Sequence, residues 1–350
     1  MPRKPFLLLG ALSLLSGLAA GLARLGWDLP VLAWTDIHGP LMVCGFFGTV
    51  IGLERAVALN RSWGFAAPAA CALGGIALLA GWRPQGAFLL SAGSLTFLAM
   101  AVVVTRRQPE PFTKVMALGA LFWSLGNLLW LSGAMVSEVV APWAAFLVLT
   151  IAGERLELAR FLPPSAWRLP LLAPPLLLVG IGAAQGVLAA GPAWTVFGLG
   201  LLALVGWSLW HDVARRTIRQ TGLTRYVAVC LLSGYAWLAL AGLLMPALDG
   251  GLATPLYDAA LHAVFVGFVF SMVFGHAPII LPAVLGLRLP YHPAFYFPLV
   301  LLHLSLALRL AGDLLDLPLS RQWGGMVNAI AIVVFIVLTA SRVLTARKAG

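Results

Sequence analysis

The sequence predicts an all-α membrane protein, a polytopic bundle of about twelve transmembrane helices. Of its 350 residues, 61% are apolar and only 10% are charged, and the mean hydropathy is +0.98. A soluble domain carries roughly 25% charged residues, because polar surface must cover its core. The apolar residues also occur in runs near the ~20 residues that cross a bilayer as a helix. These observations exclude a soluble domain, a disordered chain and a disulfide scaffold.

Twelve apolar runs follow one another without a linker long enough to separate soluble domains, so we expect a single integral membrane domain over residues 1–350. The runs must be helical, because lipid offers backbone groups no other hydrogen-bond partner. The first run could instead be a cleaved signal peptide, because small residues lie near Ala19. The runs are 6–25, 34–57, 65–82, 86–104, 113–135, 138–160, 168–188, 192–213, 224–247, 256–285, 293–313 and 322–345.

The basic residues predict the orientation of the bundle. If the N-terminus lies inside, 18 of the 22 Lys and Arg residues fall in inner segments, and only Arg24, Arg83, Arg309 and Arg321 do not. Basic residues accumulate on the cytoplasmic side of membrane proteins, so we predict that both termini lie inside (N-in/C-in). The net charge of +10 is therefore a topology signal. It does not indicate a nucleic-acid partner, and the expected partner is the lipid bilayer.

Two histidines lie at one predicted depth on separate helices. His38 begins the second run and His262 lies near the start of the tenth, and both runs lead from outside to inside. Two imidazoles so placed can supply both axial ligands of one haem iron. The alternative is a polar pair that hydrogen-bonds between helices. Small residues that would leave room for a haem ring follow both histidines: Gly39, Gly45, Gly48, Gly267 and Gly275.

A second pair of histidines predicts a possible second metal site. His276 on the tenth run and His303 on the eleventh are each about ten residues from the inner turn, so the two could meet near the middle of the membrane. They could hold copper or another haem. The alternative is that one or both bind backbone carbonyls, such as those freed near Pro278 and Pro282.

The sequence also predicts the surroundings of Arg309, His211 and His292. Arg309 lies two turns beyond His303 and needs an anion, which could be a haem propionate or, as the favoured interpretation, Asp313. His211, beside Asp212, and His292 are expected at the inner interface.

Residues 35–59 and 257–313 resemble the catalytic subunit of the haem-copper oxidases. His38-Gly39-Pro-Leu-Met42 is similar to the His-Gly-x-x-Met segment that supplies one axial ligand of the low-spin haem from the second helix of that family. The tenth helix supplies the other ligand there, as His262 would in this chain. The chain looks still more like the NnrS family, twelve-helix haem- and copper-containing relatives linked to nitric oxide metabolism.

These resemblances imply a b-type haem in the outer half of the membrane, bound by His38 and His262. They also imply a role in electron transfer or in nitric-oxide-related respiration, with quinol or a periplasmic electron carrier as the partner. The corresponding location is the inner (cytoplasmic) membrane of a bacterium.

The departures from the oxidases concern the oxygen-reducing centre. Ala260 stands where the oxidases carry the ligand of the high-spin haem, and the sequence lacks the adjacent histidines that bind their copper. Gly275-His276-Ala-Pro-Ile resembles their Gly-His-Pro-Glu segment, but it lies on the tenth run, and Ile280 stands where a redox tyrosine would be. Oxygen reduction is therefore not expected. The alternative functions are a twelve-span secondary transporter of a small solute and an assembly factor for respiratory complexes.

Overall fold

The computed structural model describes residues 3–188, 191–251 and 255–348, and every regular element in these ranges is a helix. Twelve spans within them are long and apolar enough to cross a membrane. They coincide with the twelve predicted runs, and their ends differ from the prediction by four residues or fewer. The predicted all-α, polytopic membrane fold is confirmed. The oxidase-like arrangement and the orientation stay predictions.

The chain divides into two compact units, Met1–Gly153 and Glu154–Gly350, and α7 (Val136–Ala159) crosses the boundary. The prediction of a single membrane domain is not tested by this division. The other helices of the first unit are α1 (Lys4–Arg24), η1 (Leu32–Ile37), α2 (His38–Pro40), η2 (Leu41–Phe47), α3 (Gly48–Leu59), η3 (Ser62–Phe65), α4 (Ala66–Leu79), α5 (Arg83–Arg107) and α6 (Pro111–Leu131).

The second unit contains α8 (Arg168–Leu188), α9 (Ala193–His211), α10 (Ala214–Thr217), α11 (Gly222–Leu244), η4 (Met245–Gly250), α12 (Pro255–His262), η5 (Ala263–Phe270), α13 (Ser271–Leu285), η6 (Pro293–Phe295), α14 (Tyr296–Leu314) and α15 (Pro318–Lys348).

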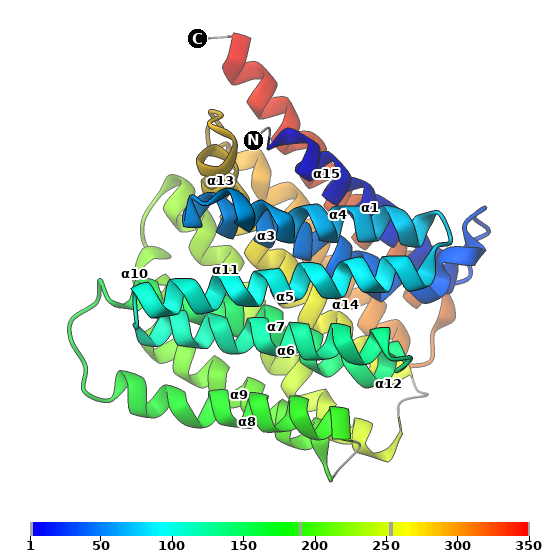
Figure 1. Ribbon diagram of the computed structural model, residues 1–350, viewed down its shortest axis with the longest axis horizontal. Helices are drawn as coiled ribbons and strands as arrows, with labels where there is room; N and C mark the ends of the chain where they lie inside the picture. Colours follow the sequence, from blue (N-terminus) through cyan, green and yellow to red (C-terminus); the bar gives the residue numbers. More distant parts are fainter. Residues whose placement is uncertain (1–2, 189–190, 252–254, 349–350) are drawn as a thin grey trace. The chain divides into compact units, whose positions relative to one another are not determined.

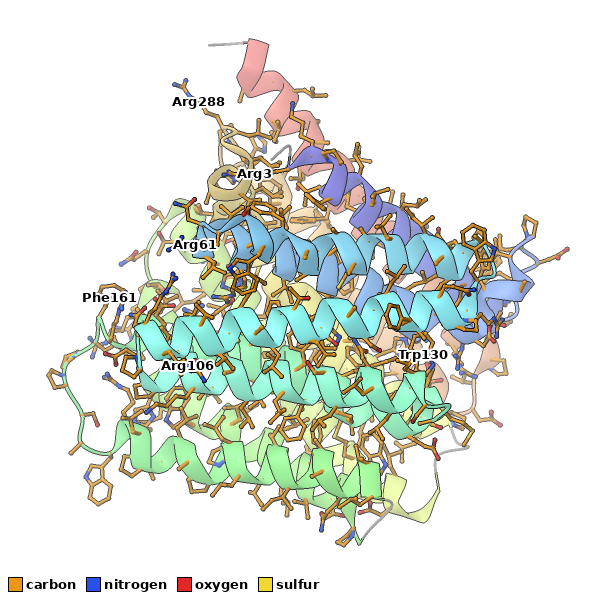
Figure 2. All side chains as sticks on the ribbon, in the orientation of Figure 1. Arg3, Arg61, Arg106, Trp130, Phe161 and Arg288 are labelled. Atoms are coloured by element: carbon orange, nitrogen blue, oxygen red, sulfur yellow. The ribbon has the colours of Figure 1, made fainter. Side chains whose placement is uncertain are left out.

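In the first unit, helices that follow one another in the chain pack side by side. Tight turns join α4 to α5 and α5 to α6, which lie next to each other (Figure 1). The core holds Trp123 stacked on Phe146, with ring centroids 4.6 Å apart. Figure 2 shows Arg61 and Arg106 at one end of these helices and Trp130 at the opposite end. These two arginines share the end of the unit that the prediction of orientation assigns to the inside.

In the second unit, the pairs α8–α9 and α14–α15 form helical hairpins, and α11 packs against α9, η5 and α13. The rings of Phe274 on α13 and Phe335 on α15 are stacked, with centroids 3.9 Å apart. This packing places the tenth span beside α11 and α14, and α14 supplies Arg309, which pairs with Asp258 on α12.

Spans two and ten share a local irregularity, because each contains a π-helical segment, η2 and η5. Pro40, which cannot donate a backbone hydrogen bond, directly precedes η2. A hydroxyl just beyond each segment donates back to a glycine carbonyl inside it: Thr49 to Gly45 (2.6 Å) and Ser271 to Gly267 (2.5 Å). Such back-bonding competes with the regular ladder, but it also occurs in regular helices of this chain, such as Ser91 to Ala87, so it accompanies the irregularity without explaining it.

Candidate functional site

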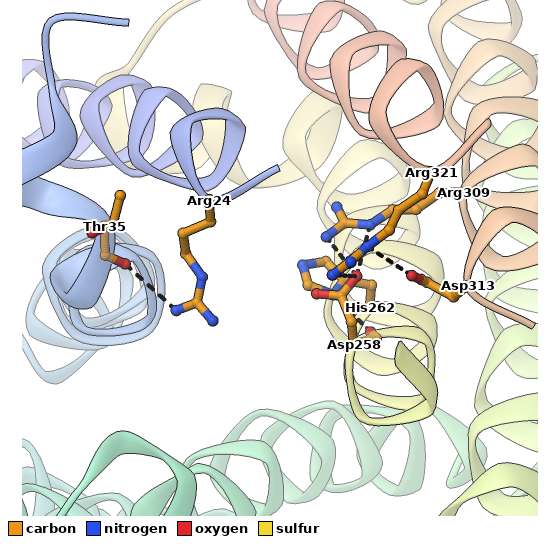
Figure 3. Close-up of polar contacts among 7 residues, drawn as sticks. All are labelled: Arg24, Thr35, Asp258, His262, Arg309, Asp313 and Arg321. Carbon is orange, nitrogen blue, oxygen red and sulfur yellow. Dashed lines mark hydrogen bonds and ion pairs between the residues drawn. The ribbon is translucent and has the colours of Figure 1, made fainter. Parts of the chain in front are cut away.

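The first helix fixes the orientation of His38. The Nδ1 atom of His38 lies 2.7 Å from the carbonyl oxygen of Gly17 on α1. A carbonyl can only accept, so Nδ1 carries the proton and the lone pair is on Nε2, the form in which a neutral imidazole binds a metal. One turn along α1, a Cβ at Gly21 would lie 2.8 Å from His38 Cε1, so the ring needs a glycine there. Arg24 also ties α1 to the carbonyl of Thr35 in η1 (3.4 Å; Figure 3).

His262 has the same tautomer but a charged neighbour. It ends α12, and its Nδ1 atom lies 2.8 Å from the backbone oxygen of Asp258 and 3.3 Å from the Oδ1 atom of the Asp258 carboxylate. The Nδ1–H group donates mainly to the carbonyl, which is the nearer oxygen, and the carboxylate is a second, more distant acceptor. As in His38, the lone pair is on Nε2.

Two arginines and a second carboxylate complete the surroundings of His262 (Figure 3). Arg309 on α14 donates to Asp258 Oδ2 from Nη2 (2.8 Å) and from Nε (3.1 Å). The Nη2 atom of Arg321 on α15 is 4.0 Å from the same oxygen, and its Nε atom lies 2.8 Å from Asp313 Oδ1. The side chain of Asp313 is fully buried, and that of Arg309 is 9% exposed.

This arrangement corrects the expectation for Arg309. Its partner is Asp258, because Asp313 pairs with Arg321. Two guanidinium groups face two carboxylates, so with a neutral His262 the cluster carries no net charge. Arg309 therefore has an anion without a haem propionate.

The histidines of the proposed second metal site have protein partners. The Nδ1 atom of His276 donates to the carbonyl of Met272 (2.7 Å), and its Nε2 atom lies 3.5 Å from Arg155 Nη1. A guanidinium cation at that distance opposes a metal ion electrostatically. His303 is held the other way round, because its Nδ1 accepts from Trp237 Nε1 (2.8 Å), which puts the proton of the neutral ring on Nε2.

Within the ranges that the structure describes, no group of three or more His, Cys, Asp or Glu residues could hold a metal ion. The contacts of His276 and His303 therefore do not favour a second site with copper, and that site stays a prediction.

The glycines that would leave room for a haem ring face protein side chains. A Cβ would meet Val136 at Gly39 (3.2 Å), Ser13 at Gly45 (2.9 Å), Trp123 at Gly48 (2.6 Å) and Cys230 at Gly275 (3.0 Å), and at Gly267 it would overlap Trp237. These positions serve close helix packing, the common role of glycine in membranes. These glycines therefore do not indicate space for a haem ring, and the haem site stays a prediction.

A buried charged group on the second unit was missed by the sequence argument. Arg155 was counted as an inner-surface charge and Asp212 as an interface residue, but their side chains are 3% and 1% exposed, and Arg155 Nε lies 3.1 Å from Asp212 Oδ2. The same carboxylate accepts from Tyr235 Oη (2.5 Å) and from the backbone N–H of Ala214 (2.8 Å). His211, the last residue of α9, is buried among protein groups as well, and its expected place at the inner interface stays a prediction.

A sequence signal existed for one of the missed residues. Asp258 lies inside an apolar run, four residues before His262, so the two share a helix face. An ionisable group in a membrane span is costly enough to mark a site by itself. Asp212 and Arg155 lie at the ends of runs, where a sequence cannot separate a buried charge from an interfacial one.

Comparison with known proteins places the chain in a family without assigning a function. No curated protein and no solved structure matches it. One family model matches residues 3–344, nearly the whole chain. The chain belongs to this family, described as Domain of unknown function (DUF8744).

Proposed function

We propose that this protein binds one b-type haem in the membrane through His38 and His262 and transfers electrons, in respiration or in nitric oxide metabolism. Its partner would be quinol or a periplasmic electron carrier, and its location the inner membrane of a bacterium. The resemblance of spans two and ten to the oxidase and NnrS families is the source of this proposal, and the local structure of each histidine supports it.

The observation that carries the proposal is a device shared by spans two and ten. In each, a histidine whose Nδ1 donates to a backbone carbonyl is followed within three residues by a π-helical segment, η2 or η5. His276 and His211 also have Nδ1 near the carbonyl four residues before, so that bond alone does not single out a ligand. Metal-binding histidines use their second nitrogen in this way, and π-helical turns are frequent at functional sites.

Both histidines offer the haem the nitrogen that it needs. A haem with two imidazole ligands exchanges one electron at an iron that has no open position for a substrate. The chain contributes the tautomer and ring orientation, through the Gly17 carbonyl for His38 and Asp258 for His262. That the two histidines bind the same iron follows from the resemblance, since each histidine belongs to a different unit.

A reduced-minus-oxidised absorption spectrum of the purified protein from haem-replete cells tests the proposal. We expect a b-type signal that His38→Ala and His262→Ala each abolish. His292→Ala is the matched control, because its Nδ1 accepts from the backbone of Ala294 and it belongs to a loop. His38→Met and His262→Met keep a group that haem iron accepts, so they should retain haem with an altered spectrum. A wild-type protein without the signal would refute the proposal.

A secondary transporter is the second candidate, and the buried pair of Arg155 and Asp212 favours it. Ionisable groups inside membranes often mark ion and substrate pathways. Proton flux into proteoliposomes under an imposed potential, reported by an internal pH dye, tests this candidate. A flux that Asp212→Asn abolishes, in a protein that shows no haem signal, would replace the first proposal with the second.

A further inference from the structure

We infer that Asp258 is a positioning residue for His262, whose carboxylate sets the electron donation of that imidazole to a bound iron and lowers the reduction potential of the haem. This inference rests on the proposed function. It adds a residue that acts on one of the two ligands, because the structure gives His262 an anionic neighbour in Asp258.

The geometry places one carboxylate oxygen at the proton of His262. Asp258 lies one helical turn before His262, and Nδ1 is 3.3 Å from Oδ1 and 2.8 Å from the backbone oxygen. The proton is therefore shared between a neutral and a negative acceptor. In His38 the same nitrogen has the Gly17 carbonyl at 2.7 Å, from another helix.

Arg309 holds the carboxylate in this position. Its Nε and Nη2 atoms both donate to Oδ2, at 3.1 Å and 2.8 Å, which turns Oδ1 toward His262 (Figure 3). Arg321 approaches Oδ2 only to 4.0 Å, because Asp313 takes its Nε at 2.8 Å. Each arginine therefore has its own carboxylate, and Arg309 acts on His262 through Asp258.

The sign of the effect follows from the charges. A negative acceptor at Nδ1 makes the imidazole a stronger donor and stabilises Fe(III) over Fe(II), which lowers the reduction potential. Asp258→Asn keeps the shape and an acceptor oxygen but removes the charge, and it leaves Arg309 unbalanced nearby. Both changes favour Fe(II), so the potential should rise. Arg309→Gln leaves the Asp258 carboxylate unbalanced, so the potential should fall.

A spectroelectrochemical titration of the purified haem-loaded protein measures this effect. For Asp258→Asn we expect the ratio of reduced to oxidised haem at a fixed applied potential to rise about tenfold, equal to about 59 mV for one electron. Arg309→Gln should change the ratio in the opposite direction, and Asp258→Glu should restore most of the wild-type value. The matched control is Asp36→Asn, an acid two residues before the other histidine that pairs with Arg83 and is largely exposed. It should leave the titration unchanged.

The outcomes separate this inference from the proposal beneath it. A wild-type protein without haem refutes the proposed function. A loaded Asp258→Asn protein that titrates like wild type overturns the role of Asp258 alone. If Asp258→Asn loses its haem, the Arg309→Gln titration decides: a lowered potential supports the inference, and an unchanged or raised potential overturns it.

Discussion

The two units bury different kinds of polar groups. Among the described residues of the first unit, the buried polar side chains are hydroxyls and one amide, such as Ser91, Ser124 and Asn127. The second unit buries four charged side chains, Arg155, Asp212, Arg309 and Asp313. A charge inside a membrane is stable only when it is paired and hydrogen-bonded, so the second unit contains contacts on which its fold and any chemistry depend together.

The two candidate haem ligands, His38 and His262, also lie beside different groups. His38 has a neutral partner, the Gly17 carbonyl, and its ring packs against Gly21. His262 lies within a balanced set of two carboxylates and two guanidinium groups. If both histidines bind one iron, the second unit supplies a ligand whose strength the Asp258 carboxylate can tune. Mutations that alter charge should therefore act mainly through the second unit.

The largest effect is expected from breaking the buried pair of Arg155 and Asp212. Asp212→Ala leaves the Arg155 charge, 3% exposed, without its carboxylate and removes the acceptor of Tyr235. Leaving one partner of a buried pair uncompensated costs about 3–5 kcal/mol. Equilibrium unfolding in mixed detergent and SDS micelles, followed by tryptophan fluorescence, measures this loss.

The control for Asp212→Ala is Glu157→Ala in the same unit. The Glu157 carboxylate is 3.5 Å from Arg160 in a partly exposed pair, with side chains 34% and 51% exposed, so its loss should change the free energy of unfolding by about 0.5 kcal/mol. Equal effects of the two substitutions would show that the burial of Arg155 does not distinguish it from a surface charge.

A smaller effect is expected from glycines in the two π-helical segments. An alanine at Gly267 overlaps the indole of Trp237, a large group that also donates to His303. Overpacking of this kind costs about 1–3 kcal/mol. At Gly45 the new Cβ would lie 2.9 Å from Ser13 Oγ, which can rotate away, and 3.0 Å from Ser13 Cβ, which would have to shift by a few tenths of an ångström. Gly267→Ala should therefore destabilise the protein more than Gly45→Ala.

The same unfolding assay ranks the glycine variants. Gly206 on α9 is the matched control, because a Cβ there would meet no atom within 4 Å. Gly206→Ala should be neutral or slightly stabilising, since alanine favours helix. If Gly45→Ala lowers the free energy of unfolding more than Gly267→Ala does, then the contact with Trp237 does not make Gly267 the more tightly packed position.

The twelve spans could be predicted from the sequence, because the length and apolar composition of a segment are enough to identify it as a candidate membrane helix. All twelve were predicted, including Val136–Ala159, whose window is the most buried. The π-helical segments were not predicted, and the bonds from Thr49 and Ser271 to glycine carbonyls that accompany them would not have revealed them. Many membrane helices contain such hydroxyls without losing their regular ladder.

The site was predictable only where its residues are close in the chain. Asp258 and His262 lie one turn apart, so an acid in an apolar run could have been recognised from spacing. Trp237 and His303 are 66 residues apart, and Arg309 is 51 residues from Asp258. These contacts depend on which helices are neighbours, which periodicity does not specify. The prediction that Arg309 pairs with Asp313 was wrong, because it chose the acid four residues away and the structure pairs Arg309 with Asp258 on another helix.

The smallest effect is expected from the exposed ion pair of Arg83 and Asp36, the first unit's counterpart to Arg155 and Asp212. Their side chains are 53% and 55% exposed, and Arg83 also donates to the carbonyl of Ala33. An exposed pair contributes about 0.2–1 kcal/mol, and salt screens it. Arg83→Gln should therefore destabilise the protein slightly at low ionic strength and less in concentrated salt. A loss as large as that of Asp212→Ala, unchanged by salt, would mean that the first unit also depends on charge, and the contrast between the units would not hold.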